Sequence, residues 1–244
     1  MSAAQDLHAG TGGKILCLGH SHLSCVARAA EAGGTDLQVL NFWEMPGALV
    51  RRGDATVFSP ALEQRLRAHD GAMFSLIGGA VHGVVGMLVH PRRFDFVLPW
   101  EPDLPLDSLA EVLPALAVRG MMEALMEEYL ALMAQLRRLH DGPLFHLESP
   151  PPCADAKRMD ADIPWDLYPG MCREISPAAT RYKLWRMHSH IVQDWCAAAG
   201  VTFVACPVAS MDADGFLLDR YYGDGAHASD RYGELVLAQM RELA

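Results

Sequence analysis

The chain has 244 residues, a hydrophobic content of 51% and a formal net charge of −10. This length fits one domain with a substantial core, and the hydrophobic content excludes a disordered protein. An acidic chain with scattered Lys and Arg is a poor candidate for binding nucleic acid or an anionic membrane surface.

The N-terminal residues 1–13 are small and polar and are expected to form a loose tail, followed by a single domain over residues 14–244. The tail lacks a basic region followed by an apolar run, so no signal peptide is expected. The longest apolar stretch, residues 76–89, contains His82 and several glycines and is too short to span a bilayer. These features favour a cytoplasmic protein without a membrane partner.

The six cysteines show no CxxC spacing, and a chain of this size does not need disulfides to fold. We therefore expect reduced thiols, with Cys17 and Cys206 buried in strands. A bridge between Cys153 and Cys172 is the alternative, because both lie in one loop-rich stretch.

Short apolar segments predict five strands, at residues 14–18, 37–41, 72–77, 143–147 and 201–205. Helices are expected between them at residues 22–32, 59–69 and 121–139, then over 182–199, and finally at 232–243. Ser59 and Pro60 are typical of a helix N-terminus, and a long loop is expected over residues 149–176.

Buried strands that alternate with helices predict an α/β fold with a parallel sheet covered on both faces. In such a sheet, ligands bind beyond the carboxyl ends of the strands. Every loop that follows a strand is therefore a candidate site.

Ser21 stands in the first of these loops, within Gly19-His20-Ser21-His22. A serine between a strand and a helix can face the crevice, and the helix N-terminus beside it favours developing negative charge. Ser21 could instead simply cap the helix. The GxSxG motif of α/β-hydrolases does not fit, because Leu23 stands where its second glycine would be.

Asp224 and His227 lie three residues apart in a turn-forming segment near the other end of the chain. This spacing lets the carboxylate reach one imidazole nitrogen and leaves the other free to accept a serine proton. The pair alone is common by chance. Together with a serine at the end of the first strand of an α/β pattern, it becomes much more specific.

These two segments resemble the SGNH (GDSL-type) hydrolases over residues 14–243. The family's Gly-Asp-Ser block is matched by Gly19-His20-Ser21, and its final Asp-x-x-His block by residues 224–227. The resemblance implies a three-layer α/β/α fold with a five-stranded parallel sheet in the flavodoxin-like order 2-1-3-4-5. It also implies that Ser21 is the nucleophile, His227 the base and Asp224 the orienting acid.

Two inner blocks of the family supply the oxyanion hole. The resemblance implies that Gly53, within residues 52–55, gives one backbone N–H, with Gly47 as the competitor. In the third block the chain reads Gly78-Gly79-Ala80, so Gly79 is kept but Ala80 replaces the family's asparagine. The only asparagine, Asn41, ends the second strand, so no shift of alignment restores it.

Loss of one oxyanion donor typically costs about 100- to 1,000-fold in rate. His82 can replace the missing donor, since an imidazole N–H can donate, or it can be an ordinary polar residue of the loop. His20 and His22 flank the nucleophile and are candidate substrate contacts.

A metal site is the alternative for His20 and His22, which share a face of an extended segment, but zinc would need a third ligand. No GxGxxG or Walker sequence follows a strand. We therefore expect neither a metal nor a cofactor.

The sequence predicts an esterase or acyl-ester hydrolase or transferase that acts on an ester-linked acyl group of a small molecule or glycan. The alternative is a non-catalytic binding protein that kept the fold and lost the oxyanion asparagine. The sequence sets neither the acyl group nor the oligomeric state.

Overall fold

The computed structural model describes residues 15–163, 165–167, 170 and 172–244. The expected tail over residues 1–13 lies outside the described residues, as does the first residue of the first expected strand.

The central sheet contains the five predicted strands, β1 (Ile15–Gly19), β2 (Leu37–Asn41), β5 (Ala72–Leu76), β8 (Leu144–Leu147) and β9 (Thr202–Val204). Their order in space is β2-β1-β5-β8-β9, and all neighbours are parallel. This is the order 2-1-3-4-5, so the predicted topology is confirmed. All five carboxyl ends meet at one edge of the sheet, where the site is expected.

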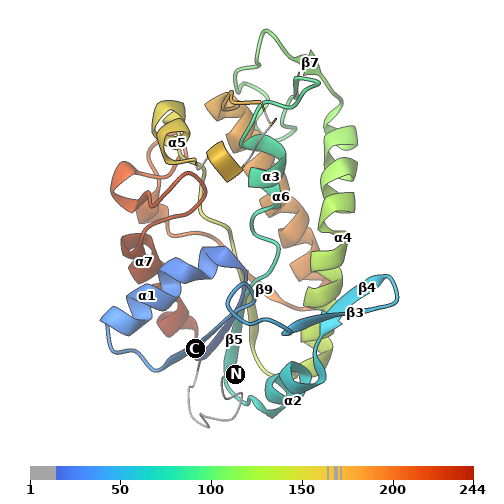
Figure 1. Cartoon of the computed structure of the whole chain (residues 1–244), viewed down its shortest axis with the longest axis vertical. Helices are drawn as coiled ribbons and strands as arrows, with labels where there is room; N and C mark the ends of the chain where they lie inside the picture. Colours follow the sequence, from blue (N-terminus) through green and yellow to red (C-terminus); the bar gives the residue numbers. More distant parts are fainter. Residues whose placement is uncertain (1–14, 164, 168–169, 171) are drawn as a thin grey trace.

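Helices cover both faces of the sheet (Figure 1). One face carries α1 (Ser24–Ala32) and α7 (Asp230–Leu243), and the other carries α2 (Pro60–Ala68), α4 (Ala115–Leu139) and α6 (Ala178–Ala199). Successive residues of β1 alternate between the two layers, since Leu16 and Leu18 belong to the core under α4 and α6 and Cys17 to the core under α1. The fold is thus a three-layer α/β/α sandwich.

Most helix boundaries follow local signals. Ser59 accepts a hydrogen bond from the Leu62 N–H at 3.4 Å as the predicted cap of α2. Gly200 ends α6 in the left-handed conformation (φ +65°), which a glycine adopts without strain. The long helix begins at Ala115 instead of residue 121, because burial of Val118 in the core outweighs the weak helix propensity of Gly120.

Several short elements were not expected. Residues between β2 and α2 form a hairpin of β3 (Leu49–Arg52) and β4 (Ala55–Phe58). The short helix α3 (Val81–Gly86) follows β5, and β6 (Phe94–Asp95) pairs with β7 (Glu111–Val112) before α4. Within the expected loop of residues 149–176, Asp155 caps the N-terminus of α5 (Ala156–Asp162), and its carboxylate accepts two backbone N–H groups.

A buried ion pair fastens the segment between α3 and α4 to α6. Lys183 Nζ lies 2.6 Å from Asp95 Oδ1, and both side chains are fully buried. The Asp95 carboxylate also accepts the N–H groups of Phe96 and Asp107, and Lys183 donates to the carbonyl of Pro105. Two buried charges satisfied in this way hold the segment 95–107 in one position.

Helices α1 and α7 pack with almost no space between their backbones. A Cβ on Gly233 of α7 would lie 2.1 Å from the carbonyl oxygen of Cys25 in α1. The contact therefore requires a glycine.

The six cysteines are free thiols, and five of them, including Cys17 and Cys206 as predicted, are buried. Cys153 is not bonded to Cys172. Among the described residues, no helix combines the length and apolar character needed to span a membrane.

Candidate active site

Ser21 lies at the carboxyl edge of the sheet, in a 3-10 turn (η1, Ser21–Leu23) between β1 and α1. The tight turn depends on Gly19, because a Cβ there would lie 2.4 Å from the carbonyl oxygen of Leu76 in β5. No side-chain hydrogen bond caps η1 or α1, so the Ser21 hydroxyl is not used as a helix cap. The capping interpretation of Ser21 is therefore wrong.

Asp224 and His227 form the contact that their spacing predicts. The His227 Nδ1 atom lies 2.9 Å from Asp224 Oδ1 and 3.1 Å from Oδ2. Burial acts to raise the pKa of Asp224, but hydrogen bonds from the His227 ring and from backbone N–H groups outweigh it and lower this pKa to about 2. The carboxylate is thus ionised at neutral pH and holds the ring by Nδ1, which leaves Nε2 for another partner.

The three residues meet at one cavity of about 520 Å³, which Ser21, Asp224 and His227 line together with polar side chains of α1 and of the start of α7. We call it the polar cavity. Within the described part of the chain, no hydrogen bond of 3.5 Å or less joins Ser21 to His227. Apo sites often have such looser geometry.

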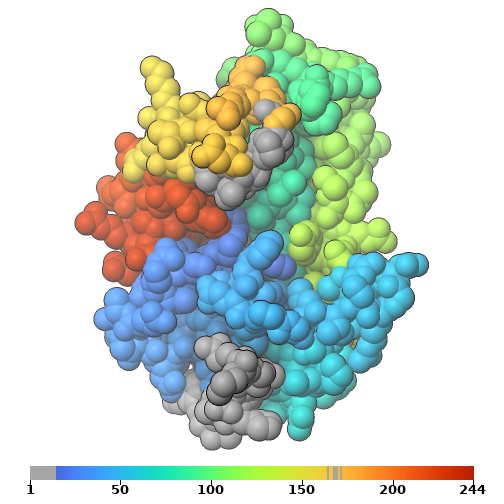
Figure 2. All heavy atoms as spheres, viewed as in Figure 1, coloured from blue at the N-terminus to red at the C-terminus, as the bar shows by residue number. Residues whose placement is uncertain are grey.

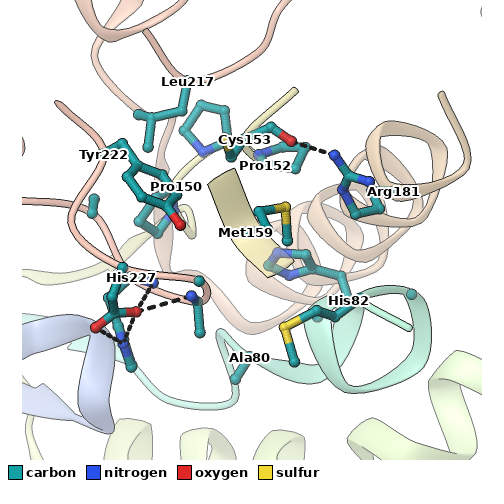
Figure 3. A pocket seen from close by; sticks show the side chains of 18 of the residues that line it. Ala80, His82, Pro150, Pro152, Cys153, Met159, Arg181, Leu217, Tyr222 and His227 are labelled. Carbon is teal, nitrogen blue, oxygen red and sulfur yellow. Dashed lines mark hydrogen bonds and ion pairs between the residues drawn. The ribbon is translucent and has the colours of Figure 1, made fainter. Parts of the chain in front are cut away.

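A second cavity of about 330 Å³ lies on the other side of His227, between α3, α5 and residues 150–153 (Figure 3). We call it the apolar cavity, because most of its wall is aliphatic or proline. The residues that line both cavities are His22, Tyr222, Asp224, His227 and Ala228. The Asp224–His227 pair thus lies on the boundary between an apolar and a polar compartment.

His22 stands at this boundary, with its ring centroid 5.3 Å from that of His227. Its side chain is buried, and its Nδ1 atom has no hydrogen-bond partner among the described residues. Burial, with a smaller contribution from His227, lowers the pKa of His22 to about 3. His22 is therefore neutral at physiological pH.

The glycine loop after β5 is held from three sides. The Gly78 N–H donates to His20 Nδ1 at 3.3 Å, and His188 Nε2 lies 3.2 Å from the Gly78 carbonyl oxygen. The Ser149 hydroxyl donates to the Gly79 carbonyl at 2.7 Å. Among the described residues, no acceptor takes the N–H of Gly79 or of Ser21. Both groups are therefore available to a ligand.

His82 lies on α3 and lines the apolar cavity together with Ala80, His22 and His227. Its Nδ1 atom is buried without a hydrogen-bond partner in the described structure, and its ring packs against His188 with centroids 5.3 Å apart. Burial lowers the pKa of His82 well below its usual value, so the ring is neutral. His82 lines the compartment next to the one that contains Ser21.

Gly53 lies away from the other expected site residues. It occupies the turn of the β3–β4 hairpin with φ +61° and is exposed. It lines neither of the two cavities that His227 lines, and Figures 1 and 2 show the hairpin on the opposite side of the molecule from α7. Gly47, the alternative, is also exposed and outside both cavities.

The structure adds lining residues that the sequence did not single out. Tyr222 stands two residues before Asp224, and its hydroxyl donates to Asp162 of α5 at 2.8 Å. Arg181 and Met159 come from α6 and α5. Residues 150–152 line the apolar cavity, as their place after the fourth strand suggested. Across the described ranges, no group of three or more His, Cys, Asp or Glu side chains could hold a metal ion.

The fold and site define a doubly wound α/β protein with Ser, Asp and His at the carboxyl edge of its sheet. No protein-family model and no curated protein matches the chain. Similar solved structures include a GDSL-like lipase from Bacteroides thetaiotaomicron, with 13% identity and a TM-score of 0.44, over 94% of this chain and 88% of that one. A carbohydrate acetylesterase from Sinorhizobium meliloti has 12% identity and a TM-score of 0.43, over 94% and 97% of the two chains.

A third similar structure is the periplasmic domain of a lipopolysaccharide acetyltransferase from Salmonella ser. Paratyphi A. It has 7% identity and a TM-score of 0.46, over 95% of this chain and 84% of that one.

Proposed function

We propose that this protein hydrolyses or transfers ester-linked acyl groups, with Ser21 as nucleophile, His227 as general base and Asp224 as the residue that orients it. The observation that carries the proposal is the Asp224–His227 contact at 2.9 Å in a cavity that Ser21 also lines. A carboxylate on Nδ1 fixes the proton there and leaves Nε2 basic.

In the first half of the reaction, Ser21 Oγ attacks the ester carbonyl carbon while its proton passes to His227 Nε2. The tetrahedral intermediate then collapses, and the imidazolium returns that proton to the departing alcohol. A water molecule, or a second alcohol in a transfer reaction, attacks the acyl-serine by the same steps. Asp224 stays ionised throughout, in keeping with its low pKa.

The oxyanion would be held by backbone N–H groups of Ser21 and Gly79, which have no acceptor among the described residues. His82 is the proposed third donor in place of the absent asparagine, because its buried Nδ1 lacks a partner within the described chain and its ring shares the apolar cavity with Ala80. Preorganised donors of this kind supply most of the stabilisation in acyl transfer.

The two compartments suggest where the two halves of the substrate bind. The apolar cavity suits the acyl group, and the polar cavity suits the alcohol of a small molecule or glycan. Arg28 and Asp230, which pair at 2.5 Å, line the polar side and offer hydrogen bonds to hydroxyl groups.

A fluorophosphonate probe tests the proposal, because it labels an activated serine. We expect the protein to be labelled and to hydrolyse 4-nitrophenyl esters, and Ser21→Ala to abolish both. Ser24→Ala is the matched control, since Ser24 lines the same cavity but accepts a hydrogen bond from Asn41. Absence of labelling and hydrolysis in the unmodified protein would favour the binding-protein alternative.

A further inference from the structure

Arg181 is a buried cation in the wall of the apolar cavity. Its side chain is 4% exposed and comes from the first turn of α6. Its guanidinium donates to the carbonyl oxygens of Ser176, Cys153 and Ala154, the last two at 2.6 and 3.1 Å. Within the described residues, no carboxylate lies within 4.0 Å of it, and its buried Nε atom has no partner.

Two neighbouring cations on the same helix each form an ion pair, unlike Arg181. Lys183 has Asp95 at 2.6 Å, and Arg186 has Glu101 at 3.1 Å. Burial lowers the pKa of Arg181 to about 10, so the group remains charged at neutral pH. A buried charge without a counter-charge is unfavourable, and carbonyl dipoles compensate it only in part. The carboxylate of Asp155 acts on Arg181 only from a distance, so among the described residues no anion contacts the guanidinium, and a ligand can supply one.

The cavity connects this cation to the catalytic pair. Figure 3 shows His227 and Arg181 on opposite sides of the pocket, with Pro150 and Met159 between them. Leu217, Met87 and Ile163 complete an apolar middle. A volume of about 330 Å³ holds roughly ten groups of the size of a water molecule. A chain of methylene groups fits the middle, and a negative charge fits the end at Arg181.

We propose that the apolar cavity binds an acyl group that carries a carboxylate at its far end, so that the substrate is a half-ester of a dicarboxylic acid of about four to six carbons. The inference rests on the proposed function of Ser21. The ester carbonyl lies at Ser21 and His227, the methylene groups contact Pro150 and Met159, and the carboxylate pairs with the guanidinium of Arg181. A charge-assisted hydrogen bond of this kind is roughly twice as strong as a neutral one.

Two substrates of equal length test the charge. The 4-nitrophenyl half-ester of adipic acid and 4-nitrophenyl hexanoate differ only in the terminal carboxylate. We expect a higher kcat/KM for the half-ester, and we expect Arg181→Met to lower that value by about 10- to 100-fold more than the value for hexanoate. Arg186→Met is the matched control, because it removes a charge from the same helix at a different cavity, and it should leave the ratio unchanged.

A binding measurement separates this inference from the proposed function. Calorimetry with Ser21→Ala protein should show free adipate binding more tightly than hexanoate, and Arg181→Met in that background should remove the preference. If the protein binds adipate through Arg181 but hydrolyses no ester, the proposed esterase function is wrong and the proposed carboxylate site is supported. An active esterase with no preference for adipate or its half-ester would overturn the inference alone.

Two further arms decide the remaining outcomes. If Arg181→Met fails to fold, as judged by circular dichroism, the inference is tested with Arg181→Lys and with the ligand preference of the unmodified protein. Lys keeps the charge but not the planar group, and it should weaken adipate binding less than Met. The hexanoyl ester of glucuronic acid places the carboxylate in the alcohol instead. If this ester is the preferred substrate and depends on Arg181, the assignment to the acyl group is wrong.

Discussion

His20 Nδ1 accepts a hydrogen bond from the backbone N–H of Gly78 at 3.3 Å. This bond joins the turn before Ser21 to the glycine loop after β5. The His20 ring is itself fixed by edge-on packing against Phe42 and Tyr129, each with a centroid distance of 5.4 Å. His20 therefore holds the two loops of the proposed oxyanion hole together.

The Asp224–His227 contact predicts the effect of removing the carboxylate charge. Asp224→Asn should lower kcat by about 1,000- to 10,000-fold, because an amide neither fixes the Nδ1 proton nor stabilises the imidazolium. Asp70→Asn is the control, since Asp70 is exposed and lines neither cavity. Steady-state hydrolysis of 4-nitrophenyl esters measures both. Equal activities of the two variants would remove Asp224 from the mechanism.

The two glycines expected to serve the oxyanion should respond differently to alanine. A Cβ on Gly79 would lie 2.7 Å from the Ser149 hydroxyl, so Gly79→Ala must displace the loop, and kcat should fall at least about ten-fold. Gly53→Ala should cost about 1–2 kcal/mol of stability because of its positive φ, with kcat/KM kept within about two-fold. Urea denaturation and ester hydrolysis test both. A large loss of kcat in Gly53→Ala would restore its assignment from the sequence.

His82 is expected to act chiefly in the transition state. His82→Ala should lower kcat by about 10- to 1,000-fold and change KM less. The exposed His90, outside both cavities, provides the control His90→Ala. Ala80→Asn should raise the activity toward simple aryl esters if the loop keeps the family's shape. Unchanged turnover of His82→Ala would point to a backbone amide or a water molecule instead.

The buried Lys183–Asp95 pair predicts a large loss of stability when one partner is removed. Lys183→Met leaves Asp95 charged and buried, which typically costs about 3–5 kcal/mol. The double variant Asp95→Asn/Lys183→Met should recover part of this loss, because the remaining amide still accepts backbone N–H groups. Urea denaturation gives the free energies of unfolding. A loss below about 1 kcal/mol for the single variant would contradict the argument.

Four histidines whose pKa values are lowered by burial, His22, His82, His146 and His188, predict a loss of stability in acid. Burial lowers the pKa values of His22 and His146 to about 3 and that of His188 to about 4, from an ordinary 6.5. Below pH 6.5 the unfolded chain binds protons that the folded chain does not, so stability falls as the pH decreases toward 4. Each histidine contributes roughly 1.4 kcal/mol per pH unit in this window.

Urea denaturation between pH 7 and pH 5 measures this slope. His146→Gln removes one of the titrating groups and leaves a hydrogen-bonding side chain beside Ser75, which lies 3.1 Å from His146 Nδ1. The slope should therefore decrease by no more than about one quarter, because His82 also has a pKa well below its usual value and contributes in the same window. An unchanged slope would show that His146 does not titrate in this range.

The sheet was predictable because each of its strands is a short apolar run, and burial on both faces leaves this pattern in the sequence. The Asp224–His227 contact was predictable because it is local. The hairpin around Gly53 was missed because charged residues at positions 51, 52 and 54 interrupt its short apolar segments, and a two-stranded hairpin gives a weak signal. The expected role of Gly53 as an oxyanion donor assumed that a loop, and not a hairpin, follows the second strand.

The charged and polar residues of α6 show a different limit. Lys183, Arg181 and His188 read as the polar residues of an amphipathic helix, but all three are buried. Lys183 contacts the segment 95–105, Arg181 contacts residues 153–154, and His188 contacts Gly78. No local sequence pattern connects these residues to α6. Burial of a charge by distant segments is a tertiary property, and a single sequence does not display it.

The close contact between Gly233 and Cys25 links stability to geometry at the site. Ser21 lies four residues before Cys25, and His227 lies six residues before Gly233, so both residues stand at the same end of two helices that cross at this point. The distance between Ser21 and His227 is thus set by how closely α1 and α7 pack where they cross. A bulkier residue at position 233 would push α7 from α1 and increase the gap between serine and histidine, although it touches neither.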